Sequence, residues 1–423
     1  MMMKTFKLSA IALVMGLGAA LSAPAMAQVA AVQCPGYEKG KTQLVGERTG
    51  KKVQRAFEAY NEDKVDEALE ILYDIDPSDD FDKAYVGRFI GNLLAAREGD
   101  GMKALGYLKE AVQPKVLNDT EHAGTLKLIA DLSMQEEKYL DAIEWYKKWM
   151  EFTCKEDATI YTRLAQAYYE SKQLPKIIEP ADKAIALNMA ANKPDKNPYV
   201  LKLTSYYERK MYPETVKVAE ELVTHFPETG RWWTQLGLFY MLVEDYKKAL
   251  STFELAYSQG FLEKANEIKN FSQLYATNGM PWRAAKVLEK HVESGLLEDN
   301  AEMMASIANA YHQAKNYKTA ANFYGKAAAK SSDPDHYRKQ GTLLLVAEDY
   351  KGAIKALQAA LDRGAEDVGT IHFSLMEANF YAGNFKEAYR HVQEAKKDRA
   401  VRRNAVAWEP YIKEKAKNRG IQI

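Results

Sequence analysis

The sequence repeats itself about every 33 to 38 residues, and this limits the fold more than any other feature does. The clearest copy begins at Gly230. If Gly230 is position 1, its marked positions are 4, 7, 8, 11, 17, 20, 24 and 27, occupied by Trp233, Leu236, Gly237, Tyr240, Tyr246, Ala249, Phe253 and Ala256. The same register predicts ten units, which start near 49, 85, 123, 158, 196, 230, 265, 301, 334 and 369.

Each unit divides into two segments whose apolar residues recur at i, i+3, i+4 and i+7, the period of an amphipathic helix. Short polar junctions such as Glu244-Asp245 separate the segments. Small residues at positions 8, 20 and 27 allow two helix backbones to approach closely, and aromatic residues at positions 4, 11 and 24 fill the space beside them. The pattern therefore predicts an all-α chain of helical hairpins whose core includes Trp233, Tyr240 and Phe253.

This pattern resembles the tetratricopeptide repeat, whose consensus W-x2-L-G-x2-Y…A-x3-F…A is met almost in full by residues 233–256. The resemblance extends over residues 49–396 and is faint in the first two units. It implies a right-handed superhelical α-solenoid of about ten hairpins, with a groove lined by the first helix of each unit. Groove positions 2, 5, 9, 12 and 13 then supply candidate partner-binding residues: Tyr169, Tyr207, Arg231, Thr234, Leu238, Lys269, Gln273, Asn309, His312, Arg338, Phe373 and Phe380.

Residues 1–27 read as a secretory signal peptide, since Lys4 and Lys7 precede an apolar run that ends before Ala25-Met26-Ala27. We expect cleavage after about Ala27 and export to a bacterial periplasm. Residues 28–48 lack a helical period and are expected to form an extended arm. No later segment reaches the length of a membrane span, so we expect no integral membrane segment in the mature chain.

The chain has two cysteines, Cys34 in the arm and Cys154 after the third repeat. In an oxidising compartment an even number of cysteines favours a disulfide, and two unpaired thiols are the alternative. Residues 397–423 are expected to form a basic capping helix and tail, with Val406, Trp408, Tyr411 and Ile412 on its apolar side. The cations around its start are either a solvated surface or a site for an acidic partner: Lys396, Lys397, Arg399, Arg402 and Arg403.

The sequence contains no recognisable catalytic motif or metal-binding motif. The seven histidines show no metal-ligand spacing, and no nucleophile motif or phosphate-binding loop is present. Balanced totals of 58 basic and 58 acidic residues do not favour nucleic acid as a partner. We therefore expect a non-enzymatic protein that needs no cofactor and binds other proteins of the cell envelope.

A narrower resemblance lies in the export signal, the segment at 33–75 and the overall layout. These are similar to periplasmic tetratricopeptide proteins that accompany a second TonB-type energy-transduction system. That resemblance implies an accessory that contacts TonB-complex components and supports iron or siderophore uptake. The alternatives are a scaffold for envelope assembly or secretion, and a module that binds peptidoglycan or another glycan.

Overall fold

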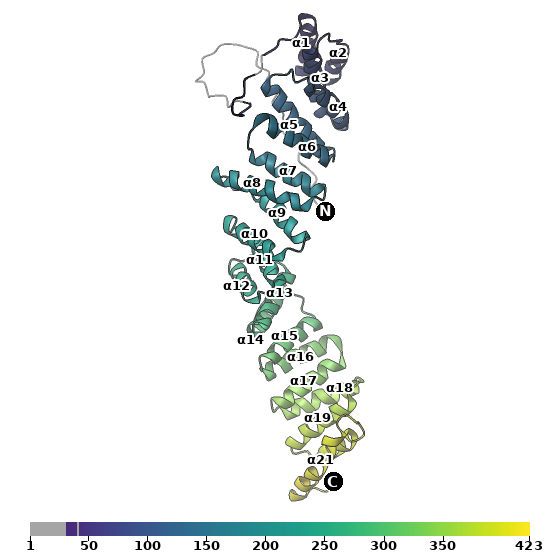
Figure 1. Cartoon of the computed structure of the whole chain (residues 1–423). Helices are drawn as coiled ribbons and strands as arrows, with labels where there is room; N and C mark the ends of the chain where they lie inside the picture. The colour runs from purple at the N-terminus through teal and green to yellow at the C-terminus, as the bar shows by residue number, and fades with distance from the viewer. Residues whose placement is uncertain (1–30, 40–41) are drawn as a thin grey trace. The chain divides into compact units, whose positions relative to one another are not determined.

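The computed structural model describes residues 31–39 and 42–423, which form two compact parts, residues 31–173 and 174–423. The predicted signal peptide at 1–27 lies outside the described residues. Within them the chain is all-helical with no strand, so the predicted α-solenoid class is confirmed. Figure 1 shows the helices following one another as successive pairs.

The first part contains three helical hairpins and one further helix. Its helices are α1 (Glu47–Asn61), α2 (Val65–Tyr73), α3 (Asp80–Ala95), α4 (Gly101–Val112), α5 (Asp119–Gln135), α6 (Tyr139–Thr153) and α7 (Ala158–Glu170). The predicted starts near 49, 85 and 123 compare with first helices that begin at Glu47, Asp80 and Asp119. Side chains set two of these starts, because Asp79 and Asn118 accept hydrogen bonds from the Asp82 and Glu121 amides.

The second part opens with a short 3-10 helix, η1 (Leu174–Ile177), and α8 (Ile178–Ala190). Six hairpins and a last helix follow: α9 (Lys196–Glu208), α10 (Tyr212–His225), α11 (Gly230–Leu242), α12 (Tyr246–Ser258), α13 (Ala265–Thr277), α14 (Pro281–Glu293), α15 (Ala301–Gln313), α16 (Tyr317–Ser331), α17 (Pro334–Val346), α18 (Tyr350–Asp362), α19 (Val368–Tyr381), α20 (Phe385–Ala395) and α21 (Arg402–Asn418). The fourth predicted unit is divided, since α7 belongs to the first part and α8 to the second.

The turns inside the hairpins share one backbone conformation. Each carries a single residue at positive φ, such as Glu244 in the α11–α12 turn, Glu348 in the α17–α18 turn and Gly383 in the α19–α20 turn. Glycine adopts this conformation freely, whereas other residues adopt it at a cost of roughly 1 to 2 kcal/mol. The polar junctions seen in the sequence are these turns.

Close helix crossings occur where the sequence places a small residue opposite a large one. A Cβ added at Gly237 of α11 would collide with the Phe253 ring of α12, and one added at Gly341 of α17 would lie 2.5 Å from Leu357 Cγ of α18. The same contact recurs in the first part between Gly91 of α3 and Leu108 of α4. The small residue at position 8 is therefore a steric requirement of the hairpin.

We expect Gly237→Leu to lower the free energy of unfolding of the second part by about 1 to 3 kcal/mol, because the new side chain has to displace Phe253. Urea unfolding followed by circular dichroism measures the loss. Gly106→Leu in α4 is the matched control, since nothing lies within 4 Å of a Cβ built there. Equal losses in the two variants would contradict the steric explanation.

One predicted core residue is placed differently. Trp233 is only half-buried at the start of α11, where its indole N–H donates to the Pro227 carbonyl at 2.8 Å. The neighbouring Trp232 is 3% exposed, because the buried stripe of α11 runs through Trp232, Leu236 and Tyr240 at i, i+4 and i+8. Tyr240 and Phe253 are buried as predicted.

The arm is fastened to the first part at several points. A disulfide joins Cys34 to Cys154, with Cα atoms 4.9 Å apart, and beside it the Gln33 amide donates to the Thr153 carbonyl at 2.7 Å. The Tyr37 hydroxyl donates to Asp119 Oδ1 at 2.8 Å. The arm therefore connects the end of α6 to the start of α5.

The last helix, α21, buries one of the residues predicted for its apolar side and exposes two others. Ile412 is fully buried, and so are Ala405 and Ala416, which complete its inner face. Val406 was expected on that face, but it is exposed together with Tyr411. Residues 405, 412 and 416 share one side of a helix, and Val406 lies away from it because each residue rotates the helix by about 100°.

Candidate protein-binding face

The residues predicted to line the groove fall into three groups. Thr234 is buried, whereas Tyr169, Arg338, Phe373 and Phe380 are half-buried. The exposed members are Tyr207, Arg231, Leu238, Lys269, Gln273, Asn309 and His312. Tyr169 belongs to the first part, and all the others belong to the second.

The buried member is a wrong prediction. Thr234 is 6% exposed, and its hydroxyl donates to the Arg231 carbonyl at 3.0 Å. It lies one turn before the buried Gly237, on the side of α11 that packs against α12. Thr234 is therefore part of the packing of α11 and cannot contact a partner.

Four exposed residues on α11 and α13 form what we call the first-helix face: Arg231, Leu238, Lys269 and Gln273. Leu238 is 39% exposed, which is high for a leucine in the middle of a helix. The Arg231 guanidinium lies 4.2 Å from the centre of the Trp232 ring and keeps its charge at the surface. This face offers apolar, cationic and amide groups that the hairpin core does not use.

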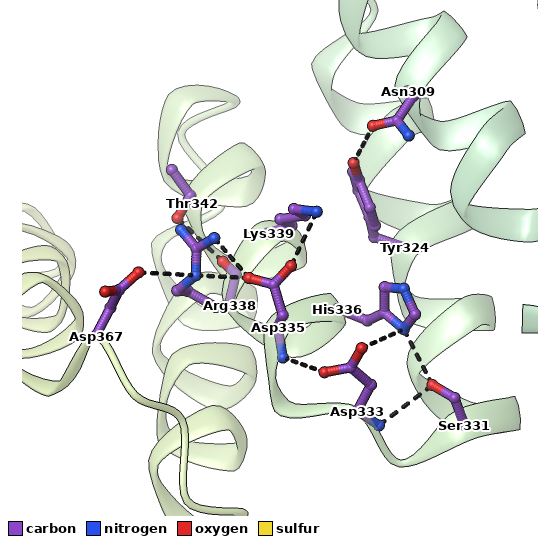
Figure 2. Close-up of polar contacts among 10 residues, drawn as sticks. All are labelled: Asn309, Tyr324, Ser331, Asp333, Asp335, His336, Arg338, Lys339, Thr342 and Asp367. Carbon is purple, nitrogen blue, oxygen red and sulfur yellow. Dashed lines mark hydrogen bonds and ion pairs between the residues drawn. The ribbon is translucent and has the colours of Figure 1, made fainter. Parts of the chain in front are cut away.

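Farther along the chain, intramolecular contacts engage two of the predicted residues. Figure 2 shows Arg338 between two carboxylates: its Nη2 lies 2.5 Å from Asp335 Oδ1, and its Nε lies 3.8 Å from Asp367 Oδ2. Figure 2 also shows Asn309 accepting a hydrogen bond from the Tyr324 hydroxyl. A partner would have to compete with these contacts, so Arg338 and Asn309 are less available than the apolar Leu238.

The C-terminal helix covers another pair of predicted residues. Phe373 and Phe380 both pack against the core cluster that α19, α20 and α21 share. The Phe380 ring lies 5.3 Å from the ring of Trp408 in edge-to-face geometry. These two phenylalanines therefore mainly attach the capping helix to the last hairpin.

Three tyrosines at position 11 link successive hairpins. The hydroxyl of Tyr275 on α13 donates to Glu254 Oε1 on α12 at 2.9 Å, and Tyr311 on α15 donates to Glu289 on α14 at 2.7 Å. Tyr240 donates to Glu220 of α10 in the same way. The motif search missed these glutamates, although they recur at position 25 of three consecutive units.

Burial and the hydrogen bond to Glu254 raise the pKa of Tyr275 to about 12. We expect Tyr275→Phe to lower the free energy of unfolding by about 1 to 2 kcal/mol, because Glu254 loses a charge-assisted hydrogen bond. Tyr324→Phe on α16 is a matched control, since the Tyr324 hydroxyl donates to the neutral amide oxygen of Asn309 and to no carboxylate. Thermal unfolding compares them, and a smaller loss for Tyr275→Phe than for the control would contradict the expectation.

A histidine pair lies between α19 and α20. His372 Nδ1 and His391 Nδ1 are 2.9 Å apart, and Arg390 Nη2 lies 3.2 Å from His391 Nε2. Arginine can only donate, so His391 accepts at Nε2 and carries its proton on Nδ1, which donates to His372. Both rings are therefore neutral in this arrangement.

Burial lowers the pKa of His391 to about 4, with further lowering by Arg390 and His372. Burial also lowers the pKa of His372. The other charged groups that act on the pair are Glu387, Glu394 and Lys397. The pair is thus a neutral contact within the last hairpin.

Other features of the described residues add no chemistry. A hollow of about 660 Å3 lies between α16, α17 and α18, lined in part by Asn322, Gln340 and Lys355, and no predicted site residue reaches it. No group of three His, Cys, Asp or Glu side chains in the described ranges is arranged to hold a metal. No described helix combines the length and apolar character that crossing a bilayer requires.

Comparison with known proteins supports the family assignment. A sequence model described as tetratricopeptide repeat matches residues 338–404, which extend from α17 to the start of α21. No curated protein matches the sequence.

Solved structures with similar folds include the TPR2AB domain of yeast Sti1 in complex with pHSP90, which is 19% identical over 61% of this chain and 98% of that one, with a TM-score of 0.33. A tetratricopeptide repeat protein from Parabacteroides merdae is 14% identical over 60% and 98%, with a TM-score of 0.34. MamA from Desulfovibrio magneticus RS-1 is 20% identical over 42% and 94%, with a TM-score of 0.33. Similarity at this level carries no information about function. Residues 338–404 therefore match the tetratricopeptide repeat family, and the hairpins before them follow the same register.

Proposed function

We propose that this protein is a non-enzymatic scaffold that binds an envelope protein on the first-helix face. The tetratricopeptide fold is one that serves protein–protein interaction. The observation that carries the proposal is the exposure of Leu238 and Gln273, whose helices bury their other faces in the hairpin core. Exposed apolar and arginine side chains such as Leu238 and Arg231 are typical of protein-binding surfaces.

We further propose that the protein works in the periplasm as an accessory of a TonB-type energy-transduction complex in iron or siderophore uptake. The order of basic, apolar and small residues at 1–27 supports export. The segment at 33–75 supports the TonB association, because it resembles the corresponding segment of such accessories.

Photocrosslinking in cells tests the partner and the face together. A photoreactive residue replaces Leu238 or Gln273, and mass spectrometry identifies the captured protein. The same residue at Lys247, which is exposed on the second helix α12, is the matched control. Capture of a TonB-complex component from Leu238 or Gln273, but not from Lys247, is the expected result.

Other outcomes separate the alternatives. Capture of an unrelated envelope protein at Leu238 would keep the scaffold and reject the TonB association. Retention of the purified protein on peptidoglycan, without any protein adduct, would favour the glycan-binding alternative. Deletion of the gene is expected to slow growth when iron is limiting, and unchanged growth would count against a role in iron uptake.

A further inference from the structure

The C-terminal end of the second part carries a cluster of aromatic side chains from four helices. We call it the terminal aromatic patch, and it consists of Tyr350 of α18, Phe380 and Tyr381 of α19, Phe385 of α20, and Trp408 and Tyr411 of α21. Neighbouring rings are in contact: Tyr350 stacks on Tyr381 at 5.4 Å, Tyr381 lies 6.3 Å from Trp408, and Trp408 lies 5.8 Å from Tyr411. The rings therefore form one continuous surface.

Much of this patch faces solvent. Tyr381 is 54% exposed and Tyr411 is 43% exposed, whereas Tyr350 is half-buried. Phe380 and Trp408 are half-buried beneath them and hold the tyrosines in place. Rigid, exposed tyrosines over a tryptophan are the side chains on which protein interfaces concentrate their binding energy.

Charge is concentrated at the same end. The whole chain has equal numbers of basic and acidic residues, but residues 396–423 contain nine Lys or Arg against three Asp or Glu. Some of these cations are neutralised internally, since Lys396 and Lys413 both contact Glu409 at 2.6 and 2.8 Å. Their neutralisation fixes α21 against the last hairpin and leaves the other cations in excess.

Two of the excess cations lie on the aromatic rings. Lys415 Nζ is 5.3 Å from the centre of the Tyr411 ring, and Arg419 Cζ is 5.8 Å from that of Phe385. Neither has a carboxylate within ion-pair distance among the described residues. Each is held by a neutral ring, so its positive charge is open to an anionic group from outside.

The patch is also polarised. Lys415 and Arg419 lie at its α20 and α21 side, whereas Glu348 lies near Tyr350, whose pKa is raised by burial and then by Glu348. A segment that crosses the patch would meet cations at one end and a carboxylate at the other. An acidic group therefore fits at the Lys415 side, with an apolar side chain on Tyr381 and Tyr411.

We propose that the terminal aromatic patch, with Lys415 and Arg419, binds an acidic segment of a partner protein through carboxylates and one apolar anchor. This surface goes beyond the proposed function, because it is separate from the first-helix face and uses other residues. A membrane surface fits less well. The outward side of α21 intersperses the exposed Val406, Ala407 and Pro410 with the charged Arg403, Glu414 and Lys417, where an interfacial helix would present a continuous apolar stripe.

Fluorescence anisotropy with a labelled peptide and the full exported chain tests whether the terminal aromatic patch binds an acidic segment. The probe is a Glu-rich peptide of about twelve residues with a central Phe, a length that spans several helices when extended. In the control peptide, Gln replaces every Glu. We expect the Glu-rich peptide to bind and the Gln-rich one to bind about tenfold more weakly or not at all, with affinity falling as salt rises.

Two variants in the patch and one matched control away from it locate the site. Lys415→Glu/Arg419→Glu is expected to weaken binding of the Glu-rich peptide by about tenfold or more, because both charges are reversed. Lys247→Glu/Lys318→Glu, on α12 and α16, carries the same change in net charge away from the patch and is expected to bind like the parent. Tyr411→Ser, which keeps every charge, is also expected to weaken binding.

Some results would overturn the proposal. Equal loss in the two charge-reversed variants would show that only the net charge matters. Binding to vesicles with anionic lipid, but not to the peptide, would assign the surface to a membrane. If Lys415→Glu/Arg419→Glu fails to fold by circular dichroism, Lys415→Gln/Arg419→Gln replaces it, and undiminished binding there would reject the site. Because the crosslinking experiment uses Leu238 and Gln273, either test can fail without the other.

Discussion

Reduction of the Cys34–Cys154 disulfide is expected to lower the free energy of unfolding of the first part by about 4 to 5 kcal/mol. The two cysteines are 120 residues apart, so the bond removes a large amount of conformational freedom from the unfolded chain. In the folded state it also keeps Gln33 close to the Thr153 carbonyl. Hydrogen exchange of the α1 to α6 amides, with and without a reductant, measures the effect.

The variant Cys34→Ser/Cys154→Ser is the control for this experiment. It lacks the bond under all conditions, so its exchange should match that of the reduced parent and should not respond to reductant. Helices α9 to α20 lie in the second part and should exchange at the same rate in every sample. Identical protection of the first part in the oxidised and reduced parent would contradict the expected stabilisation.

Lowering the pH from about 7 to 4 is expected to destabilise the last hairpin by about 3 kcal/mol through His391. An unfolded histidine has a pKa of about 6.5, and His391 in the fold has a pKa of about 4. Between these values the unfolded chain binds a proton that the folded chain does not. Stability is therefore full above pH 6.5 and is lost as the pH falls towards 4.

Hydrogen exchange of α19 and α20 across this pH range, corrected for intrinsic exchange, measures the loss. His391→Gln is the informative variant, because glutamine can donate to His372 and accept from Arg390 without titrating. It should flatten the pH dependence, whereas His312→Gln, at an exposed histidine on α15, should leave it unchanged. A parent and a His391→Gln variant with the same pH dependence would rule out the histidine pair as the cause.

The repeat pattern was sufficient to predict the hairpins, because their packing is dictated by residue size. Gly237 opposite Phe253 is such a case. Only glycine fits there, so its position in the sequence marks where the two helices of the hairpin cross. The half-buried Trp233 shows the limit of this reasoning. At the first turn of a helix, a shift of one residue changes which of two adjacent tryptophans faces the core, and both Trp232 and Trp233 satisfy the aromatic pattern.

The candidate site was less predictable because it depends on contacts with residues that the repeat pattern does not mark. Groove positions within one repeat do not reveal that Asp335 and Asp367 surround Arg338, or that Trp408 packs on Phe380. Asp335 and Asp367 lie in the same unit as Arg338 but at positions that the repeat pattern does not mark, and Trp408 lies outside the repeats altogether. By contrast, Leu238 and Gln273 are exposed, and their place in a partner-binding groove stays a prediction.

The tyrosine and glutamate contacts between hairpins have a consequence for how the second part comes apart. When one hairpin unfolds, its neighbour is left with a polar group that has lost its partner, so fraying is penalised on both sides of the break. The junctions of α10 with α11, α12 with α13 and α14 with α15 carry such contacts in sequence. These hairpins therefore melt as one cooperative block instead of peeling away singly.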